Sequence, residues 1–377
     1  MAEAPQKLVI VGLSGGVDSA VAALCLLREG YRVRGLHMTN WEDANEYCTA
    51  GTDLADARRV AADLGIPLHE ANFSRQYRAA VFEDFLRELG AGRTPNPDVA
   101  CNRHIKFGVF LEHATRLGAD FIATGHYARV THDPEPRLFR SSDRDKDQTY
   151  FLHSIERAAL ARTLFPLGAL EKHAVRRLAR EYGLANHAKK DSTGICFVGE
   201  RPFRQFLAEH VSGKSGPILN SAGQKVGEHI GLPFYTLGQR EGLKVGGRND
   251  SLQSPWFVAA KDLAGNALII VQGRDHPWLL RQELRAGELR WLAGEPAGLD
   301  TGLELHARIR HRQLPTRCHV RSVPGGQIEV VFAMAQRTPT PGQYLVLYRG
   351  EECLGGGVIL ESGEMQAAAL PANLATA

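Results

Sequence analysis

A short glycine-rich segment near the N-terminus constrains this chain more than any other feature. It reads Gly-Leu-Ser-Gly-Gly-Val-Asp-Ser over Gly12–Ser19, between an apolar run, Leu8 to Val11, and a helical pattern over Ala20 to Arg28. Gly15 and Gly16 have no Cβ atom, so their backbone amides can close around an anion. A helix that begins beside them directs its unpaired N–H groups and its positive dipole end to the same point. The pattern therefore predicts a phosphate-binding loop between a strand and a helix.

The residues of this loop exclude two commoner nucleotide motifs. A P-loop ends in Gly-Lys-Ser/Thr, and its lysine is absent here, as is the dinucleotide spacing Gly-x-Gly-x-x-Gly. The order Ser-Gly-Gly-x-Asp-Ser resembles the pyrophosphate loop of the ATP pyrophosphatases, which cleave ATP to AMP and pyrophosphate, usually by adenylating a substrate. A carboxylate beside bound phosphates is a ligand for Mg²⁺, which we expect near Asp18. The residues expected to bind ATP in this loop are Gly12, Leu13, Ser14, Gly15, Gly16, Val17, Asp18 and Ser19.

The length and composition are those of an ordinary soluble globular protein. The chain has 377 residues, which allows two or three domains, with 44% hydrophobic and 23% charged residues. The N-terminus lacks the pattern of a signal peptide, and no apolar run is long enough to span a bilayer. We therefore expect a cytoplasmic protein that does not act at a membrane. Because no exposed apolar helix face stands out in the sequence, we also expect a monomer. The net charge of +3 favours a polyanionic partner only weakly.

The first half of the chain alternates between strand and helix patterns. Strands are expected at Leu8–Val11, Arg32–Met38, Leu68–Asn72 and Phe121–Ala123, and helices at Ser19–Glu29, Leu54–Leu64, Tyr77–Leu89 and Phe107–Leu117. This alternation predicts an α/β fold with a doubly wound, Rossmann-like parallel sheet, whose ligands bind at the carboxyl ends of the strands. Ala91 to Arg103 contains two prolines and a glycine, which predicts a structured loop there.

The second half changes toward β structure. Ala158 to Val211 favours helix with a glycine-rich break, and Pro217 to about Leu280 combines glycines with short apolar runs. Short alternating segments recur from about Arg285 to Leu360, which predicts a small β-barrel. We therefore expect a catalytic domain over 1–211, a small β-rich central domain over 212–284, a barrel over 285–363 and an Ala-rich, disordered tail over 364–377.

Two of the six cysteines are distinguished by their surroundings. No Cys-x-x-Cys pair occurs, so a zinc site is not expected. Cys101 and Cys196 lie in segments rich in turn-forming residues, beside cationic side chains that would lower a thiol pKa if close in space. Cys25 falls in an apolar helical pattern, and Cys318 and Cys353 fall in strand patterns, so these three are expected to be structural. Two loop cysteines in a chain with an ATP-adenylating loop indicate sulfur transfer onto an activated substrate.

Ordered motifs along nearly the whole chain resemble those of the bacterial tRNA-specific 2-thiouridylases, a family of the ATP pyrophosphatase superfamily. Beyond the opening loop they include Asn96-Pro97-Asp98, Thr124-Gly125-His126-Tyr127, Asp145-Lys146-Asp147-Gln148, Lys189–Gly194, Tyr235–Arg240, Thr340–Gln343 and Cys353–Gly357. The resemblance implies 2-thiolation of the wobble uridine in Glu, Gln and Lys type tRNAs. It implies that ATP adenylates the C2 oxygen, and that the sulfur comes from a persulfide supplied by a sulfur-relay protein or a cysteine desulfurase.

The resemblance also implies roles for individual residues. Met38 and Gly125 flank the adenine nucleotide, Cys196 carries the persulfide, and Cys101 attacks it or helps to free its sulfur, with a transient disulfide between the two. Asp98 is the acid or base beside the uridine. The flipped base is held by Asn96, Pro97 and Asp98, and the expected tRNA contacts are His126, Lys146, Asp147, Gln148, Arg310, His311 and Gln343, where His311 replaces a frequent tyrosine.

Two other functions stay open from the sequence. An ATP pyrophosphatase that adenylates a small metabolite accounts for the opening loop, but it leaves Cys101, Cys196 and the basic barrel without a role. AMP formation without tRNA would favour it. A nucleic-acid-binding module with an unused nucleotide fold would bind tRNA without forming product. The complete set of polar groups over Ser14–Ser19 argues against that module.

Overall fold

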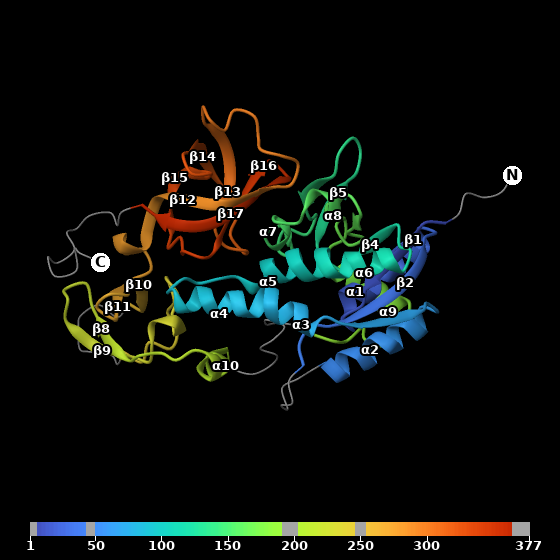
Figure 1. The fold of residues 1–377 in the computed structure, drawn as a ribbon, viewed down its shortest axis with the longest axis horizontal. Coiled ribbons are helices and arrows are strands. Elements are labelled where there is room, and N and C mark those ends of the chain that lie inside the picture. The colour runs from blue at the N-terminus through green and yellow to red at the C-terminus, as the bar shows by residue number, and fades with distance from the viewer. Residues whose placement is uncertain (1–5, 43–49, 191–202, 246–253, 364–377) are drawn as a thin grey trace.

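The computed structural model describes residues 6–42, 50–190, 203–245 and 254–363, which form an elongated molecule (Figure 1). The N-terminal sheet lies at one end, the strands of the C-terminal half lie toward the other, and two long helical stretches run lengthwise between them. Within the described ranges, no helix is long and apolar enough to cross a membrane.

The N-terminal sheet contains, in the described residues, five parallel strands in the order β3-β2-β1-β4-β7. These are β3 (Leu68–Asn72), β2 (Arg32–Thr39), β1 (Leu8–Gly12), β4 (Phe121–Ala123) and β7 (Thr163–Leu164). Every residue of β1 is buried, as expected of a central parallel strand covered on both faces. Four of the strands agree with the sequence prediction, whereas β7, which is only two residues long, lies in a stretch predicted to be helical.

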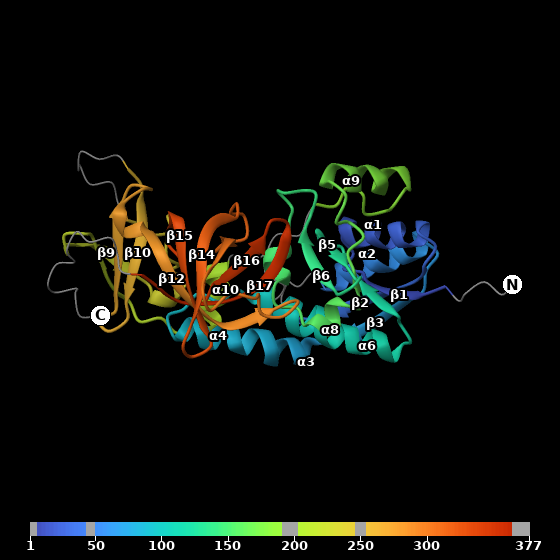
Figure 2. The same cartoon turned by 90° about the horizontal axis from the view of Figure 1, so that it is seen from above.

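Helices cover both faces of this sheet (Figure 2). One face, with Val9 and Val11 of β1, packs on α1 (Val17–Arg28), α2 (Ala50–Asp63) and α9 (Lys172–Glu181). The other face, with Ile10, packs on two helical stretches. The first consists of α3 (Ser74–Tyr77), η1 (Arg78–Phe82) and α4 (Glu83–Gly90), and the second of α5 (Pro97–Ala100), η2 (Cys101–Val109) and α6 (Phe110–Arg116). Alternate residues of β1 thus pack into hydrophobic cores on opposite faces of the sheet, which confirms the doubly wound sheet.

The prediction of a loop over 91–103 is wrong in its second half. Asn96 caps α5, because its side-chain oxygen accepts a hydrogen bond from the backbone N–H of Asp98 at 3.2 Å, and Pro97 takes the first helical position. Proline is tolerated there, since the first turn of a helix leaves its N–H groups without intrahelical partners. The helix then continues through η2, which is π-helical, into α6. Cys101 consequently lies on a helix and not in a loop.

The remaining strands form a small sheet and a barrel, which confirms the β-rich character predicted for the second half. The small sheet contains β8 (Gly216–Leu219), β9 (Lys225–His229), β10 (Trp256–Asp262) and β11 (Ala267–Gln272). The barrel contains β12 (Leu280–Trp291), β13 (Leu303–Arg308), β14 (Thr316–Val323), β15 (Gln327–Arg337), β16 (Tyr344–Arg349) and β17 (Glu352–Ser362), and it closes because β12 pairs with both β15 and β17. Short helical elements connect these parts: α7 (Thr149–Leu152), α8 (Arg157–Leu160), α10 (Phe203–His210), η3 (Leu232–Phe234) and η4 (Pro277–Leu279).

A hairpin from the N-terminal half extends the barrel sheet. Its strands, β5 (Ala128–Thr131) and β6 (Arg137–Arg140), follow β4 along the chain, and β6 pairs with β17, where Cys353 lies opposite Leu138. The sequence pattern does not predict this hairpin, because the strand that pairs with it lies near the other end of the chain. The hairpin joins the region of the parallel sheet to the barrel.

Candidate active site

The predicted phosphate loop has the expected strand–loop–helix geometry. Gly16 is the N-cap of α1, and Gly15 has a φ of +76°. A Cβ atom on Gly15 would lie 2.5 Å from the carbonyl oxygen of Asp53, so only glycine fits there. The Ser19 hydroxyl accepts the backbone N–H of Ser14 at 3.3 Å and donates to the Gly16 carbonyl at 3.0 Å. These bonds hold the loop in one shape, with the first N–H groups of α1 available to an anion.

Two further residues predicted to border ATP lie against this loop. A Cβ atom on Gly125 would lie 2.7 Å from backbone atoms of Asp18 and Ser19, so the end of β4 approaches α1 too closely for any side chain. Met38 of β2 has its Cε atom 3.4 Å from the position of a Cβ atom on Gly12. The structure thus brings these residues together, while their contact with ATP stays a prediction.

The sequence analysis missed the cation that faces Asp18. The Lys172 ammonium, at the first residue of α9, is 2.7 and 2.8 Å from the two carboxylate oxygens of Asp18. Tyr127 donates its hydroxyl to the same carboxylate at 3.0 Å. The lysine is 154 residues away in sequence, so no local spacing could have indicated it. Both charges lie where phosphates would enter the loop.

The Asp18 carboxylate fits the way in which proteins hold Mg²⁺ with a nucleotide. Magnesium is usually bound by one or two carboxylates together with substrate phosphates. The side chain of Asp18 is 32% exposed and is therefore accessible to such a pair. Among the residues that the structure describes, no three His, Cys, Asp or Glu side chains form a group that could hold a metal ion by themselves.

Two residues that follow α9 support the loop from one side, and neither was predicted to contact the loop. Asn186 donates to the Gly15 carbonyl at 3.0 Å. The Lys189 ammonium is 2.9 Å from a carboxylate oxygen of Asp53 and 2.6 Å from one of Asp56. The cost of burying this ammonium is outweighed by the bonds to the two carboxylates, which raise the pKa of Lys189. Lys189, which follows α9, therefore holds the acidic side chains of α2 in place through these two ion pairs.

Asp98 and Cys101 share one face of the helix formed by α5, η2 and α6, because they are about one turn apart. Cys101 is 2% exposed, and Asp98 is half-buried. Farther along the same helix, Phe110 packs 3.5 Å from the position of a Cβ atom on Gly12. Cys101 is the first residue of the nine-residue stretch η2, and Phe110, beside the phosphate loop, follows directly after its last residue. Cys196 lies outside the described residues, so its approach to Cys101 stays a prediction.

The pH dependence of the reaction should report Asp98. Burial raises the pKa of the Asp98 carboxyl, and the charge of Lys106 opposes that rise. If the ionised carboxylate accepts a proton in the reaction, the rate falls on the acid side at a higher pH than for an ordinary aspartate. Asp98→Asn should remove this fall in rate on the acid side and lower the maximal rate by roughly 10²–10⁴-fold. Lys106→Met should move the acid-side fall to still higher pH, because the positive charge that lowers the pKa of Asp98 is lost.

A profile of kcat/KM against pH checks this assignment. Substitution of the exposed Lys225 by Met is the matched control, since this lysine lies on β9 of the small sheet and pairs with Glu228. If the acid-side fall in kcat/KM persists in Asp98→Asn, or occurs at the same pH in Lys106→Met, it reports the titration of another residue.

The predicted tRNA contacts on the barrel are engaged within the protein. Gln343 donates to the carbonyl of Thr94 at 2.7 Å, and Thr94 lies shortly before the start of α5, which contains Asp98. Arg310 donates to the carbonyl of Thr338 at 3.1 Å, and the His311 ring packs on an aromatic side chain of α7 at a centroid distance of 4.3 Å. All three side chains are partly exposed, so their contact with tRNA stays a prediction.

His126, also predicted to contact tRNA, lies in the interior. Its ring bonds to the Thr124 hydroxyl at 2.8 Å and packs near Phe107 and Phe165. Burial lowers the pKa of His126 well below its usual range, and the charge of Lys106 adds to this effect. The imidazole is therefore neutral, and a contact with tRNA would first require the ring to be uncovered.

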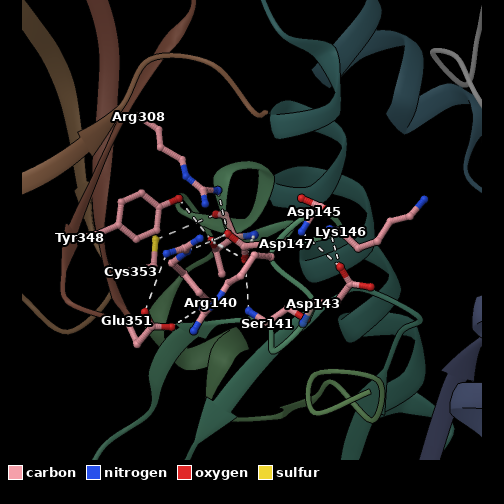
Figure 3. Close-up of polar contacts among 12 residues, drawn as sticks. Arg140, Ser141, Asp143, Asp145, Lys146, Asp147, Arg308, Tyr348, Glu351 and Cys353 are labelled. Carbon is pink, nitrogen blue, oxygen red and sulfur yellow. Dashed lines mark hydrogen bonds and ion pairs between the residues drawn. The ribbon is translucent and has the colours of Figure 1, made fainter. Parts of the chain in front are cut away.

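The segment around Asp147 differs from its predicted role. The Asp147 carboxylate is fully buried between Arg140 and Arg308, so it is not presented to tRNA (Figure 3). A buried carboxylate must be paired in this way, because an isolated charge in the interior is strongly unfavourable. Gln148 accepts the backbone N–H of Tyr127 through its side chain at 2.9 Å. Lys146 and Gln148 are the partly exposed members of this predicted set.

Comparison with protein families covers the described domains in chain order. Residues 7–200 match a family model described as tRNA methyl transferase HUP domain. Residues 204–272 match the tRNA methyl transferase PRC-barrel domain, and residues 281–359 match the aminomethyltransferase beta-barrel domain.

Curated relatives match along nearly their whole length, and each is named tRNA-specific 2-thiouridylase MnmA. The protein of Paracidovorax citrulli is 50% identical over 98% of this chain and 100% of its own length. Those of Bordetella parapertussis (53% identity, 93% of this chain, 97% of the relative) and Chromohalobacter salexigens (54%, 93% and 92%) agree. The chain belongs to the MnmA family. The family resemblance noted from the motifs is thereby confirmed.

Solved structures align less well than these relatives of the MnmA family. A 4-thiouridine synthetase–RNA complex with bound ATP aligns at a TM-score of 0.35 and 19% identity, over 52% of this chain and 46% of that chain. An alignment at this level carries no conclusion about function.

Proposed function

We propose that this chain is an ATP-dependent tRNA 2-thiouridylase, which replaces the C2 oxygen of a wobble uridine with sulfur and forms AMP and pyrophosphate. The observation that carries the proposal, in a chain of the MnmA family, is one helix that touches the phosphate loop through Phe110 and bears Asp98 and Cys101 farther along. The length of η2 separates the thiol from the loop, as the binding of a nucleotide and one flipped uridine between them requires.

In the first proposed step, the uridine C2 oxygen attacks the α-phosphate of ATP, and pyrophosphate leaves. The N–H groups at the start of α1 bind the phosphates. Lys172 offsets the negative charge that develops on the leaving pyrophosphate, and Mg²⁺ bound beside Asp18 would neutralise it further. Met38 and Gly125 border the nucleotide. The product is a uridine whose C2 oxygen carries AMP and has become a leaving group.

In the second proposed step, sulfur replaces that oxygen. The Cys101 thiolate attacks the inner sulfur of a persulfide on Cys196, the S–S bond of the persulfide breaks, and hydrosulfide is released as a Cys101–Cys196 disulfide forms. Hydrosulfide adds to C2, and AMP leaves with the oxygen. Asp98 moves protons at the uridine ring. A thiol reductant then returns both cysteines to thiols, and the sulfur donor forms a new persulfide on Cys196.

The proposed partners follow from this chemistry. We expect Glu, Gln and Lys type tRNAs as substrates and a sulfur-relay protein or cysteine desulfurase as the sulfur donor. The proposed site of action is the cytoplasm, and the proposed state is a monomer. The proposed tRNA contacts are polar side chains that are partly exposed, namely those of Lys146, Gln148, Arg310, His311 and Gln343.

Nucleoside mass analysis tests the proposed function directly. Unmodified glutamate-type tRNA is incubated with the chain, ATP, Mg²⁺ and a persulfide source. We expect 2-thiouridine with the wild-type chain and none with Cys196→Ser. The mass of the modified nucleoside also distinguishes an exchange of oxygen for sulfur from an added methyl group. A methylated base is the product that the family description tRNA methyl transferase implies. If AMP forms without tRNA and no thiolated base appears, the small-metabolite function is favoured instead.

A further inference from the structure

One buried carboxylate joins the region of the parallel sheet to the barrel (Figure 3). The Asp147 side chain is 0% exposed, and its Oδ2 atom lies 2.7 Å from Nη1 of Arg308 and 3.3 Å from Nε of Arg140. Arg140 ends β6, whereas Arg308 ends β13 of the barrel and is also buried. Charge-assisted bonds in a buried site are strong and geometrically restrictive. The position of Asp147 is therefore determined by the barrel.

The same carboxylate fixes the shape of the chain around it. Its Oδ1 atom accepts the backbone N–H of Ser141 at 3.2 Å and the hydroxyl of Thr149 at 3.0 Å. The Thr149 hydroxyl is in turn 3.2 Å from the hydroxyl of Tyr348, on β16 of the barrel. Asp147 thus joins the two ends of the loop over 141–149, and Thr149 at one end contacts the barrel.

Two routes run from this loop to the Asp18 carboxylate of the phosphate loop. In the first, Gln148 and Tyr127 form two reciprocal hydrogen bonds of 2.9 Å, and the Tyr127 hydroxyl donates to Asp18 at 3.0 Å. In the second, Asp143 accepts the backbone N–H of Lys172 at 2.9 Å, and the Lys172 ammonium binds Asp18. Both routes use contacts of hydrogen-bond length, and both end on the same carboxylate.

We propose that Asp147 and Arg308 are positioning residues of the ATP site, which fix Asp18 and Lys172 through the Gln148–Tyr127 and Asp143–Lys172 contacts. The proposal rests on ATP binding at the phosphate loop, as in the proposed function. Neither residue touches the nucleotide. The barrel, which is proposed to meet tRNA, thereby contributes to the geometry of a site on the parallel sheet. The functional role of the Asp147 side chain is then to support the ATP site and not to contact RNA.

Calorimetric titration of the full-length chain with Mg·ATP, without tRNA or a sulfur source, tests the proposal. Arg308→Met and Tyr127→Phe should each weaken ATP binding by about tenfold. The double variant should bind ATP no more weakly than the worse single variant, because the two residues act along one route. Arg308→Lys, which keeps the positive charge, should restore part of the affinity.

Arg137→Met is the matched control. Arg137 belongs to β6 and forms an exposed ion pair with Glu352 of β17 at 3.4 Å, so it links the same two parts of the molecule without touching Asp147. ATP affinity should be unchanged in this variant. Thermal melting separates loss of the fold from loss of binding. If Arg308→Met does not fold, Tyr127→Phe, which removes one hydroxyl, and Asp147→Asn, which keeps the side-chain volume, still decide the matter.

The outcomes separate this inference from the proposed function. ATP affinity that is unchanged in folded Arg308→Met, Asp147→Asn and Tyr127→Phe would overturn the positioning role, as would losses that simply multiply in the double variant. A fall in tRNA affinity alone would assign Arg308 to tRNA binding and also overturn it. By contrast, a wild-type chain that binds ATP but forms no 2-thiouridine would contradict only the proposed function.

Discussion

Cys101→Ser is expected to lower 2-thiouridine formation by on the order of 10³-fold or more, because a hydroxyl does not release sulfur from a persulfide at neutral pH. Release of pyrophosphate that depends on tRNA should continue, since Cys101 lies at the far end of η2 from the phosphate loop. Radiolabelled sulfur should therefore stay on the protein while adenylated tRNA accumulates. Nucleoside mass analysis, together with labelled-sulfur retention, measures both effects in one reaction.

The control for this prediction is another buried cysteine. Cys318 lies in the barrel core, where burial raises the pKa of its thiol to about 12, so it stays protonated and unreactive. Cys318→Ala should thiolate normally, apart from a loss of stability of about 1 kcal/mol. Thiolation that survives Cys101→Ser would show that sulfur is transferred from Cys196 without a second cysteine.

Lys172→Met is expected to lower the rate of AMP formation by roughly 10²–10³-fold, the usual effect of removing one preorganised charge that stabilises a leaving group. The lysine lies 2.7 Å from Asp18 at the mouth of the phosphate loop, so its ammonium is already where pyrophosphate would depart. Lys172→Arg should keep part of the rate, since the charge remains while its geometry changes. The measurement is the initial rate of AMP release in the presence of tRNA.

The exposed Lys225 again provides the comparison, because Lys225→Met removes the same charge on β9 of the small sheet. Its rate should equal that of the wild type. A Lys172→Met variant that forms AMP at the normal rate would restrict Lys172 to pairing with Asp18 in the absence of nucleotide. In that case KM for ATP, and not kcat, would carry any remaining effect.

Much of the fold could be predicted from patterns that extend over only a few residues. The buried run of β1, the glycines of the loop and the pattern of α1 are adjacent in sequence, and the structure has them as predicted. The stretch before Cys101 was predicted wrongly for a related reason. Pro97 next to Asn96 is compatible with both a turn and a helix start, and only the helix that follows distinguishes the two.

The candidate site was only partly accessible from the sequence. The phosphate loop and the Asp98–Cys101 pair were identified from motifs, whereas Lys172 and Asn186 carry no motif that connects them with the loop. Asp147 belongs to a motif, but the sequence does not distinguish a charge that faces solvent from one buried between two arginines. That distinction depends on which distant segments pack around it.

The sequence by itself determined the strand–loop–helix unit, the glycines that it requires and the order of α/β, β-rich and barrel regions. These features follow from backbone sterics and from apolar periodicity, which act between near neighbours in the chain. Only the tertiary structure decided that Lys172 faces Asp18, that β6 joins β17 and that Arg308 reaches Asp147. Such contacts form between segments that are far apart in sequence, so they depend on how the entire chain buries its apolar surface and pairs its charges.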